Sequence, residues 1–291
     1  KLEKNTDTVV LGITDYFSIE NYLYMVEQQK NGRIPNVYLI PNVELRILPV
    51  TRTETPINIH VLFDPNLSTD IIRRDFFNQL QFEYSGSKYQ CNKDALIQLG
   101  RAVKTDVVSD EEAYKSGLDQ FNISFSDLRD ILKANSLKGH FIVGVANSNK
   151  DGNSGIQDST LSATRKEIYR LSDFIFSANP NDIKFFLGNG RSTKEQLIKE
   201  YGSLKPCVRG CDAHDLNKMF RFDDNRYTWI KALPTFNGLK QILFEPEDRV
   251  CISEEKPEDK SDYQIIDSII FNNSEMNHQE IMFNQNLNTI I

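Results

Sequence analysis

The 291-residue chain has only four cysteines, one tryptophan and no long hydrophobic run. So few cysteines do not form the disulfide framework of a small secreted domain, and we expect free thiols in a reducing cytoplasm. No apolar stretch approaches the roughly 18 residues that a membrane-spanning helix needs, and no signal peptide opens the sequence. The sequence therefore argues against a membrane protein and against a disulfide-stabilised secreted protein.

The chain also lacks an excess of basic residues. It has 34 Lys and Arg against 41 Asp and Glu, which gives a formal net charge of −7. A surface that attracts nucleic acid everywhere carries the opposite balance, so any contact with phosphates would have to be local. A G-x-x-x-x-G-K-[ST] loop is absent as well, and we expect no ATP binding by this sequence.

Two further features concern cysteine spacing and the chain ends. Cys207 and Cys211 lie four residues apart, but no second cysteine pair accompanies them, so the spacing does not favour a structural zinc site. The sequence begins at Lys1 without a methionine and finishes on the apolar run NLNTII. Because a domain does not usually end on a bare apolar strand, we expect this chain to be part of a longer protein.

The sequence does contain a repeated alternation of strand-like apolar runs and amphipathic helical segments. Period-3.6 patterns predict helices, and short apolar runs predict buried strands. We expect strands at 8–14, 36–40, 56–63 and 139–147, and helices at 18–31, 68–80, 124–135, 159–177 (running into a strand) and 192–202. The last helix should begin with a capping box formed by Ser192 and Glu195. This alternation predicts an α/β fold with a parallel sheet or barrel.

The stretch GCDAHD, at 210–215, is the first candidate for chemistry. Asp212 and His214 lie two residues apart after an apolar run, and on extended backbone their side chains project to the same face. A carboxylate and an imidazole that converge in this way suit a divalent metal. An Asp–His surface turn is the alternative interpretation of so short a motif.

Other acidic and imidazole residues fall in or just after expected strands. They are Asp15, Glu44 and His60. In α/β barrels the carboxyl ends of the parallel strands converge on one face, where sites are built. We therefore expect Asp15, Glu44 and His60 to form a metal site together with Asp212 and His214. His60 lies inside its strand, so the alternative interpretation is a histidine buried in the core. For Glu44 the alternative is a surface residue that follows a turn.

These motifs resemble the PHP (polymerase and histidinol phosphatase) domain family. GITDYFSIENY is similar to its Thr-Asp-His motif, IPNVEL to its Pro-Gly-x-Glu motif, INIHVLF to its strand with an inward histidine, and RGCDAHD to its terminal Asp-x-His motif. The segment at 226–250, RYTWIKALPTFNGLKQILFEPEDRV, resembles the one that closes the PHP domain of TrlF-type ATPases, in which an ABC- or SMC-like ATPase domain follows.

The resemblance implies a fold and a domain organisation. It implies a distorted (β/α)7 PHP-type barrel at 1–252 whose first strand is missing, and a linker at 253–262. Residues 263–291 would supply the first strands of an ABC/SMC-like ATPase domain, truncated before its phosphate-binding loop. The resemblance also implies a divalent metal cofactor (Mn, Zn, Fe or Mg) at five ligand positions: Asp15, Glu44, His60, Asp212 and His214.

The sequence departs from the family motifs at two ligand positions. Tyr16 stands where the second motif has histidine, and a neutral phenol is a poor ligand for these metals. The third-motif histidine is expected just after GHFIVGV, where the chain has Asn147 and, further on, Asp151. Either oxygen-bearing side chain could replace it. His140 opens that strand, and we interpret it as structural.

The function that the resemblance implies is a metal-dependent phosphoesterase, acting as a phosphodiesterase or nuclease on nucleic acid and coupled to an ATPase, with defence against phage as a setting. The alternative is a degenerate PHP domain that senses a ligand or docks onto its ATPase domain. A homo-oligomer is compatible with both. Basic residues near the Asp-x-His motif are expected to meet phosphates, or else to form a solvated face: Lys205, Arg209, Lys218, Arg221, Arg226 and Lys231. Of these, Arg209 and Lys218 are the substrate-binding candidates.

Overall fold

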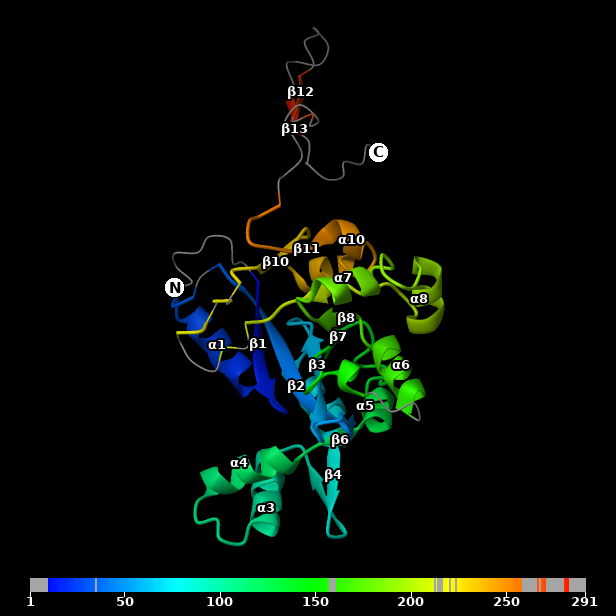
Figure 1. Cartoon of the computed structure of the whole chain (residues 1–291). Coiled ribbons are helices and arrows are strands. Elements are labelled where there is room, and N and C mark those ends of the chain that lie inside the picture. Colours follow the sequence, from blue (N-terminus) through cyan, green and yellow to red (C-terminus); the bar gives the residue numbers. More distant parts are fainter. Residues whose placement is uncertain are drawn as a thin grey trace.

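The computed structural model describes residues 10–34, 36–156, 161–211, 213, 217–219, 221–222, 224–257, 266, 268–270 and 280–282. Figure 1 shows a mixed α/β structure built on one curled, half-barrel sheet with helices beside it. The strand order is β1 (Val10–Tyr16), β2 (Tyr38–Val50), β3 (Pro56–Phe63), β7 (Phe141–Ala146), β8 (Phe174–Phe176) and β9 (Cys207–Val208), and β6 (Ile123–Ser124) pairs with β2.

All of these strands run in the same direction except β3. β3 is antiparallel to both β2 and β7. β1 pairs with β2, β7 with β8, and β8 with β9, all in parallel. The reversal follows from the short turn at 51–55, where the Thr51 backbone N–H donates to the Thr55 carbonyl at 2.8 Å. The expected parallel α/β sheet is therefore confirmed in its general form, and a hairpin interrupts the alternation.

Most helices cover one face of the sheet, which we call the helix face. In β2 it carries Val43, Leu45 and Ile47, which are fully buried because successive side chains of a strand alternate between faces. The helices that contribute buried residues to this main core are α1 (Glu20–Lys30), α2 (Thr69–Asp75), α3 (Lys93–Val103), α5 (Phe125–Ile131), α6 (Ser162–Leu171), α7 (Pro180–Phe186) and α8 (Lys194–Tyr201). The helices expected near 18–31, 68–80, 124–135 and 159–177 are thus confirmed.

The opposite face of the sheet has a smaller apolar cluster, and we call it the α9 face. Ile40, Leu62, Ile142 and Phe174 pack there against Phe236, the first residue of α9 (Phe236–Gln241). The apolar residues stop short of the middle of β2 and β3. Beyond that point the same face carries polar side chains, and these form the candidate site.

A substructure that the sequence analysis did not predict follows α2. It consists of the hairpin β4 (Gln81–Tyr84) and β5 (Ser87–Gln90) and the helices α3 (Lys93–Val103) and α4 (Asp110–Gln120), which Figure 1 places at one end of the sheet. The two helices cross at glycines. A Cβ atom on Gly100 would lie 1.8 Å from the Ala113 carbonyl oxygen, so only glycine permits this close approach.

Two expectations about element boundaries were wrong. The capping box of α8 is formed by Thr193 and Gln196, one residue later than expected. The backbone N–H of Gln196 donates to Thr193 Oγ1 at 3.3 Å, and the backbone N–H of Thr193 donates to Gln196 Oε1 at 2.9 Å. The strand expected to end at residue 40 continues through the 43–50 run as one strand, β2. It continues because β3 and β6 both pair with its second half.

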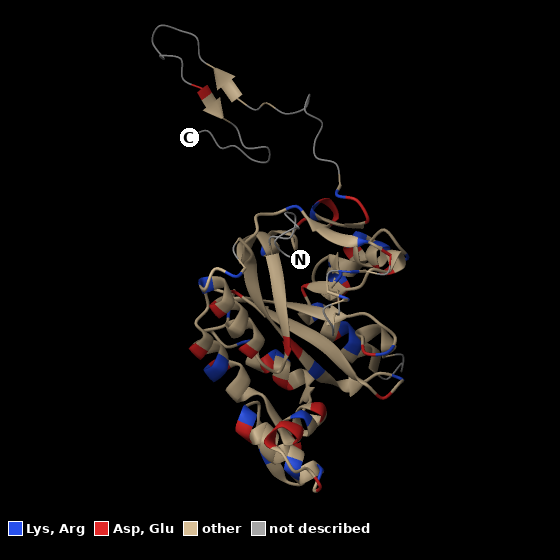
Figure 2. Cartoon of the chain, turned by 90° about the vertical axis from the view of Figure 1, so that its left-hand side faces the viewer, with Lys and Arg blue, Asp and Glu red and all other residues tan. Residues whose placement is uncertain are grey.

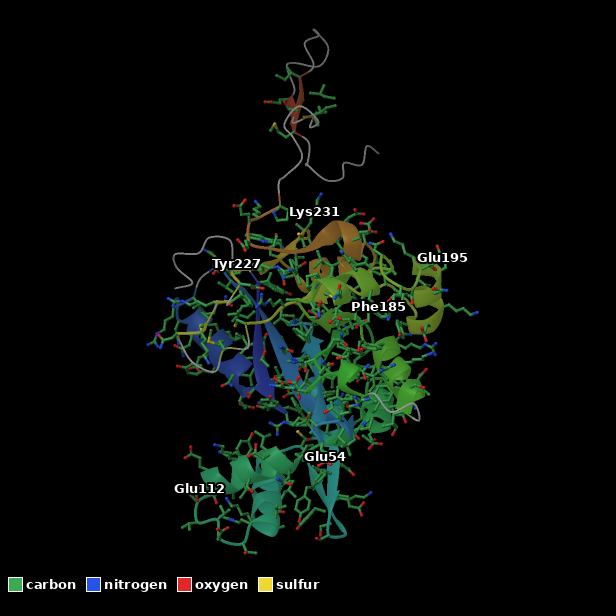
Figure 3. All side chains as sticks on the ribbon, viewed as in Figure 1. Glu54, Glu112, Phe185, Glu195, Tyr227 and Lys231 are labelled. Carbon is green, nitrogen blue, oxygen red and sulfur yellow. The ribbon has the colours of Figure 1, made fainter. Side chains whose placement is uncertain are left out.

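The segment after β9 contains short elements. β10 (Tyr227–Ile230) pairs antiparallel with β11 (Val250–Ser253), and α10 (Pro246–Arg249) leads into β11. Tyr227 begins β10 and Lys231 follows its end (Figure 3). Further along, β12 (Ser268–Ile270) pairs antiparallel with β13 (Glu280–Met282). These two short strands and Ile266 are the described part of the 263–291 region.

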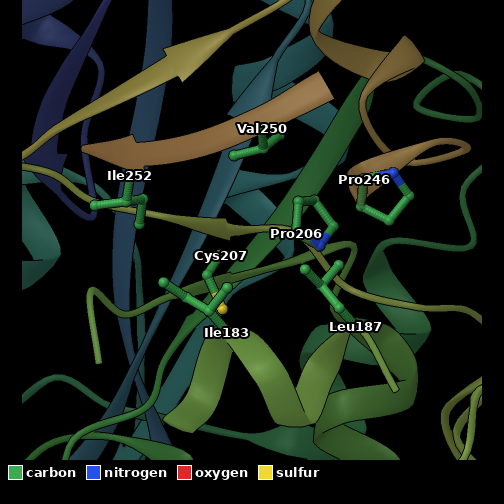
Figure 4. Close-up of a pocket in the computed structure, with 7 residues that line it drawn as sticks. All are labelled: Ile183, Leu187, Pro206, Cys207, Pro246, Val250 and Ile252. Carbon is green, nitrogen blue, oxygen red and sulfur yellow. The ribbon is translucent and has the colours of Figure 1, made fainter. Parts of the chain in front are cut away.

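The described part of the chain contains a small cavity and a larger groove. A cavity of about 20 Å³ lies between α7, β9 and β11, with an apolar lining of Ile183, Leu187, Pro206, Cys207, Pro246, Val250 and Ile252 (Figure 4). A groove of about 540 Å³ lies between β4, β5 and α5. Figure 2 shows acidic and basic residues interspersed along the ribbon. None of the helices in the described ranges combines the length and the apolar composition of a membrane span.

Candidate functional site

The candidate site is centred on Glu44 of β2 and His60 of β3. These residues are direct partners in the antiparallel register of the two strands. Directly opposed residues have Cβ atoms about 5 Å apart and project to the same face of the sheet. Both side chains are half-buried and lie on the α9 face, beyond its apolar cluster. The fold therefore brings a carboxylate and an imidazole together from residues that are 16 positions apart in the sequence.

His60 is held by its neighbours on the same face. Its Nδ1 lies 3.1 Å from Asn42 Oδ1, and its ring centre lies 4.5 Å from that of Phe176. Burial lowers the pKa of His60 from 6.5 to about 4, against the opposing charge of Asp151. The imidazole is therefore neutral near pH 7, and the neutral form is the one that binds metals.

Tyr16 and Arg46 lie beside Glu44. Tyr16 is the register partner of Glu44 across β1 and β2, and Arg46 follows Glu44 by two residues on the same face of β2. The pKa of Tyr16 is raised to about 12, first by burial and then by the charge of Glu44 and a hydrogen bond to it. The Arg46 Cζ lies 4.6 Å from the centre of the Tyr16 ring. Tyr16 is thus a neutral phenol that hydrogen bonds Glu44.

Asp15 lies on the helix face, away from Glu44. Its register partner is the fully buried Val43, and the neighbouring Tyr16 is the residue that faces Glu44. The Asp15 Oδ2 accepts a hydrogen bond from the Asn21 backbone N–H at 3.2 Å, in the first turn of α1. A carboxylate at this position satisfies an amide that the helix leaves without an intrahelical partner. In the described structure Asp15 therefore caps a helix.

The two residues of the Asp-x-His motif, Asp212 and His214, lie outside the described residues. The substitutes for the third-motif histidine are described. Asn147 uses both atoms of its amide: Nδ2 donates to Asp182 Oδ2 at 2.9 Å, and Oδ1 accepts from the Tyr169 hydroxyl. Asp151 accepts from the Ser148 hydroxyl and, at 3.4 Å, from Asn58 Nδ2. Both side chains therefore already have structural partners.

The basic residues near the motif have different environments. Lys205 is 3% exposed and donates to Ser203 Oγ at 2.9 Å, so the expectation that it meets phosphate or solvent was wrong. Arg209 pairs with Asp224, and its Cζ lies 4.4 Å from the centre of the Phe222 ring. Its substrate role stays a prediction.

The remaining basic residues divide between structural and exposed positions. Arg226 donates to the backbone carbonyls of Ala178 at 3.2 Å and Ile252 at 3.4 Å, so it ties β10 to its neighbours. Lys218, Arg221 and Lys231 are exposed. The substrate role of Lys218 stays a prediction as well.

The sequence matches no family model, and it matches no curated protein. Among the described residues, no group of three or more His, Cys, Asp or Glu side chains lies close enough together to hold a metal ion. The described geometry therefore contributes two potential donors, Glu44 and His60.

Two residues of this site were missed by the sequence analysis, Asn42 and Arg46. A signal for both was present, because they flank Glu44 at a spacing of two residues and a strand places such residues on one face. The signal was missed because the 41–50 segment was not recognised as a continuation of the strand that begins at Tyr38.

Proposed function

We propose that this protein is a metal-dependent phosphoesterase of the PHP type, acting as a phosphodiesterase or nuclease on nucleic acid. The observation that supports it best is the pairing of Glu44 with a neutral His60 on the polar part of the α9 face. A hard oxygen donor next to a neutral imidazole fits Mn²⁺, Zn²⁺ or Fe²⁺. Glu44 and His60 supply two ligands, and Asp212 and His214 would supply the others.

The residues of the chain have separate roles in this proposal. Glu44 and His60 hold the ion, and Asn42 orients His60. Tyr16 hydrogen bonds Glu44 and thereby orients its carboxylate. A bound divalent ion would polarise a phosphate ester and lower the pKa of a water molecule. In this proposal Asp15 caps α1 and does not bind the ion.

Metal content per chain tests the proposal. Protein purified without chelator would be measured by plasma mass spectrometry in the original form and as His60→Gln, Glu44→Gln and Asp212→Ala. The matched control is His140→Gln, because His140 is bonded to Asp64 at 3.3 Å on another part of the sheet. We expect bound metal in the original protein and the control, and a loss in the other three.

Equal metal content in all five proteins would contradict the proposed ligands. If metal is present and is lost in the three variants, hydrolysis of a chromogenic phosphodiester and of end-labelled DNA and RNA would then test the reaction class. Hydrolysis that survives His60→Gln unchanged would contradict the proposed role of this residue in the reaction.

A second candidate is a PHP-like module without catalysis, which senses a ligand or docks onto an ATPase domain. The observation that favours it is that two of the expected ligand residues already have structural partners: Asp15 caps α1, and Asn147 is bonded through both atoms of its amide. Absence of bound metal from the original protein, even after it is soaked with Mn²⁺ or Zn²⁺, would favour this module over the enzyme.

The wider assignments belong to the same proposal. The curled sheet is compatible with a (β/α)7 barrel, and the β12–β13 pair is compatible with the start of an ATPase domain at 263–291. The cognate ATPase domain is the proposed partner. Four free cysteines, of which Cys91 and Cys207 are buried, fit a cytoplasmic setting.

A further inference from the structure

Three polar side chains on the α9 face form a chain of hydrogen bonds that ends on His60. Asn42 is the middle member and is 6% exposed. Its Nδ2 donates to Thr14 Oγ1 at 2.7 Å, and its Oδ1 lies 3.1 Å from His60 Nδ1. The three residues come from three adjacent strands, β1, β2 and β3, so the chain of bonds runs across the sheet.

The direction of each bond follows from the chemistry of the amide. The side-chain nitrogen of Asn42 can only donate, and it donates to Thr14 Oγ1. The Asn42 oxygen is only an acceptor, so the bond to His60 requires a proton on His60 Nδ1. A neutral imidazole with its proton on Nδ1 keeps a lone pair on Nε2. Among the described residues, Asn42 is the hydrogen-bond partner of the His60 ring.

We infer that Asn42 is a positioning residue: with Thr14 it fixes His60 as the Nδ1–H tautomer and leaves Nε2 to bind a divalent metal ion. Metal-binding histidines generally donate their second ring N–H to an oxygen acceptor, which sets both the tautomer and the ring orientation. The metal part of this inference rests on the proposed function, whereas the tautomer does not.

Nitrogen-15 NMR of labelled histidine tests the tautomer directly, at neutral pH and with a chelator present. The His60 signals are assigned by their absence from His60→Gln. We expect the Nδ1–H tautomer in the original protein, retention of it in Asn42→Asp, and a shift toward the Nε2–H tautomer in Asn42→Leu. Asn42→Asp keeps an oxygen acceptor for Nδ1–H, whereas Asn42→Leu removes the acceptor at similar volume.

Thr14→Val is the second variant, because it removes the partner of the Asn42 amide from a strand position that is exposed. We expect a mixture of tautomers in it, since nothing then fixes the orientation of the amide. An Nε2–H tautomer in the original protein would overturn the inference. So would an unchanged Nδ1–H signal in both Asn42→Leu and Thr14→Val.

Titration with Mn²⁺ or Zn²⁺ alone, in competition with a fluorescent chelator, separates this inference from the proposed function. We expect Asn42→Leu to bind about 10- to 100-fold more weakly than the original protein, as for other lost partners of metal-binding histidines. Asn42→Asp should bind more tightly than Asn42→Leu. If the tautomers shift as expected but no protein binds metal, the positioning role stands and the metal-dependent function fails.

Discussion

Asp15 and Glu44 occupy neighbouring positions of the β1–β2 ladder but lie on opposite faces of the sheet. Asp15 pairs with Val43 on the helix face, whereas Glu44 pairs with Tyr16 on the α9 face. Side chains alternate along each strand, so a shift of one position exchanges the faces. A single ion held between β1 and β2 would therefore not be reached by both carboxylates from these strands.

Replacement of Asp15 distinguishes a cap from a ligand. Asp15→Ala removes the acceptor for the Asn21 amide. We expect it to lower the free energy of unfolding by about 1 kcal/mol, as for other lost helix caps, and to leave metal content unchanged. Asp15→Asn keeps an oxygen acceptor and should be nearly neutral. Urea unfolding and plasma mass spectrometry measure the two effects; loss of metal at unchanged stability would identify Asp15 as a ligand.

The stability of the protein should fall in acid because of His60. Its pKa is lowered from 6.5 to about 4 by burial, so the unfolded chain takes up the proton first. The free energy of unfolding is therefore lost progressively as the pH falls from 6.5 to about 4, by at most about 3 kcal/mol. Urea unfolding with a chelator present should show this slope in the original protein and not in His60→Gln. Identical slopes in both proteins would contradict the assignment.

The close crossing of α3 and α4 should not tolerate alanine at Gly100. Alanine favours a helix by about 1 kcal/mol over glycine. The added Cβ would lie 1.8 Å from the Ala113 carbonyl oxygen, which forces the helices apart. We expect Gly100→Ala to destabilise the protein by about 2 kcal/mol, because the clash outweighs the propensity. Gly12→Ala is the control, since its nearest neighbour would lie 3.8 Å away. Thermal unfolding compares them, and a stabilised Gly100→Ala would contradict the crossing.

Lys205 predicts a dependence on pH of the same sign as that of His60, but in an alkaline range. Burial lowers its pKa from 10.5 to about 8, with the charge of Asp173 opposing this effect. The cost of burying the ammonium is fully present below pH 8 and fades as the pH rises toward 10.5. Relative to Lys205→Met, the original protein should therefore gain stability between pH 8 and 10.5, by as much as about 3 kcal/mol.

The control for this experiment is Lys199→Met, because Lys199 is exposed on α8. Urea unfolding of the three proteins across this pH range gives the differences. A difference between the original protein and Lys205→Met that does not change with pH would show that the ammonium of Lys205 is solvated in the folded protein.

Local patterns in the sequence determined most of the secondary structure. The apolar run PINIHVLF gave β3 with both boundaries as expected, and the 3.6-residue spacing of Ile19, Tyr22 and Val26 gave the buried side of α1. These elements were predictable because the hydrophobic period of a segment reflects which of its side chains face the core. The α3–α4 pair was not recognised, although the Asn92 cap and the apolar residues Leu96 and Leu99 mark α3 in the sequence. What the sequence does not show is the tight crossing, because it pairs glycines of two different helices, Gly100 and Gly117.

The residue types of the site could be read from the sequence, but their grouping could not. The sequence by itself placed Glu44 and His60 in or near strands. The tertiary structure decided that they are register partners on one face, that Asp15 turns to the other face to cap α1, and that Lys205 is buried. The physical reason is that register and face are set by pairing between strands distant in the sequence, and a shift of one residue would exchange the two faces.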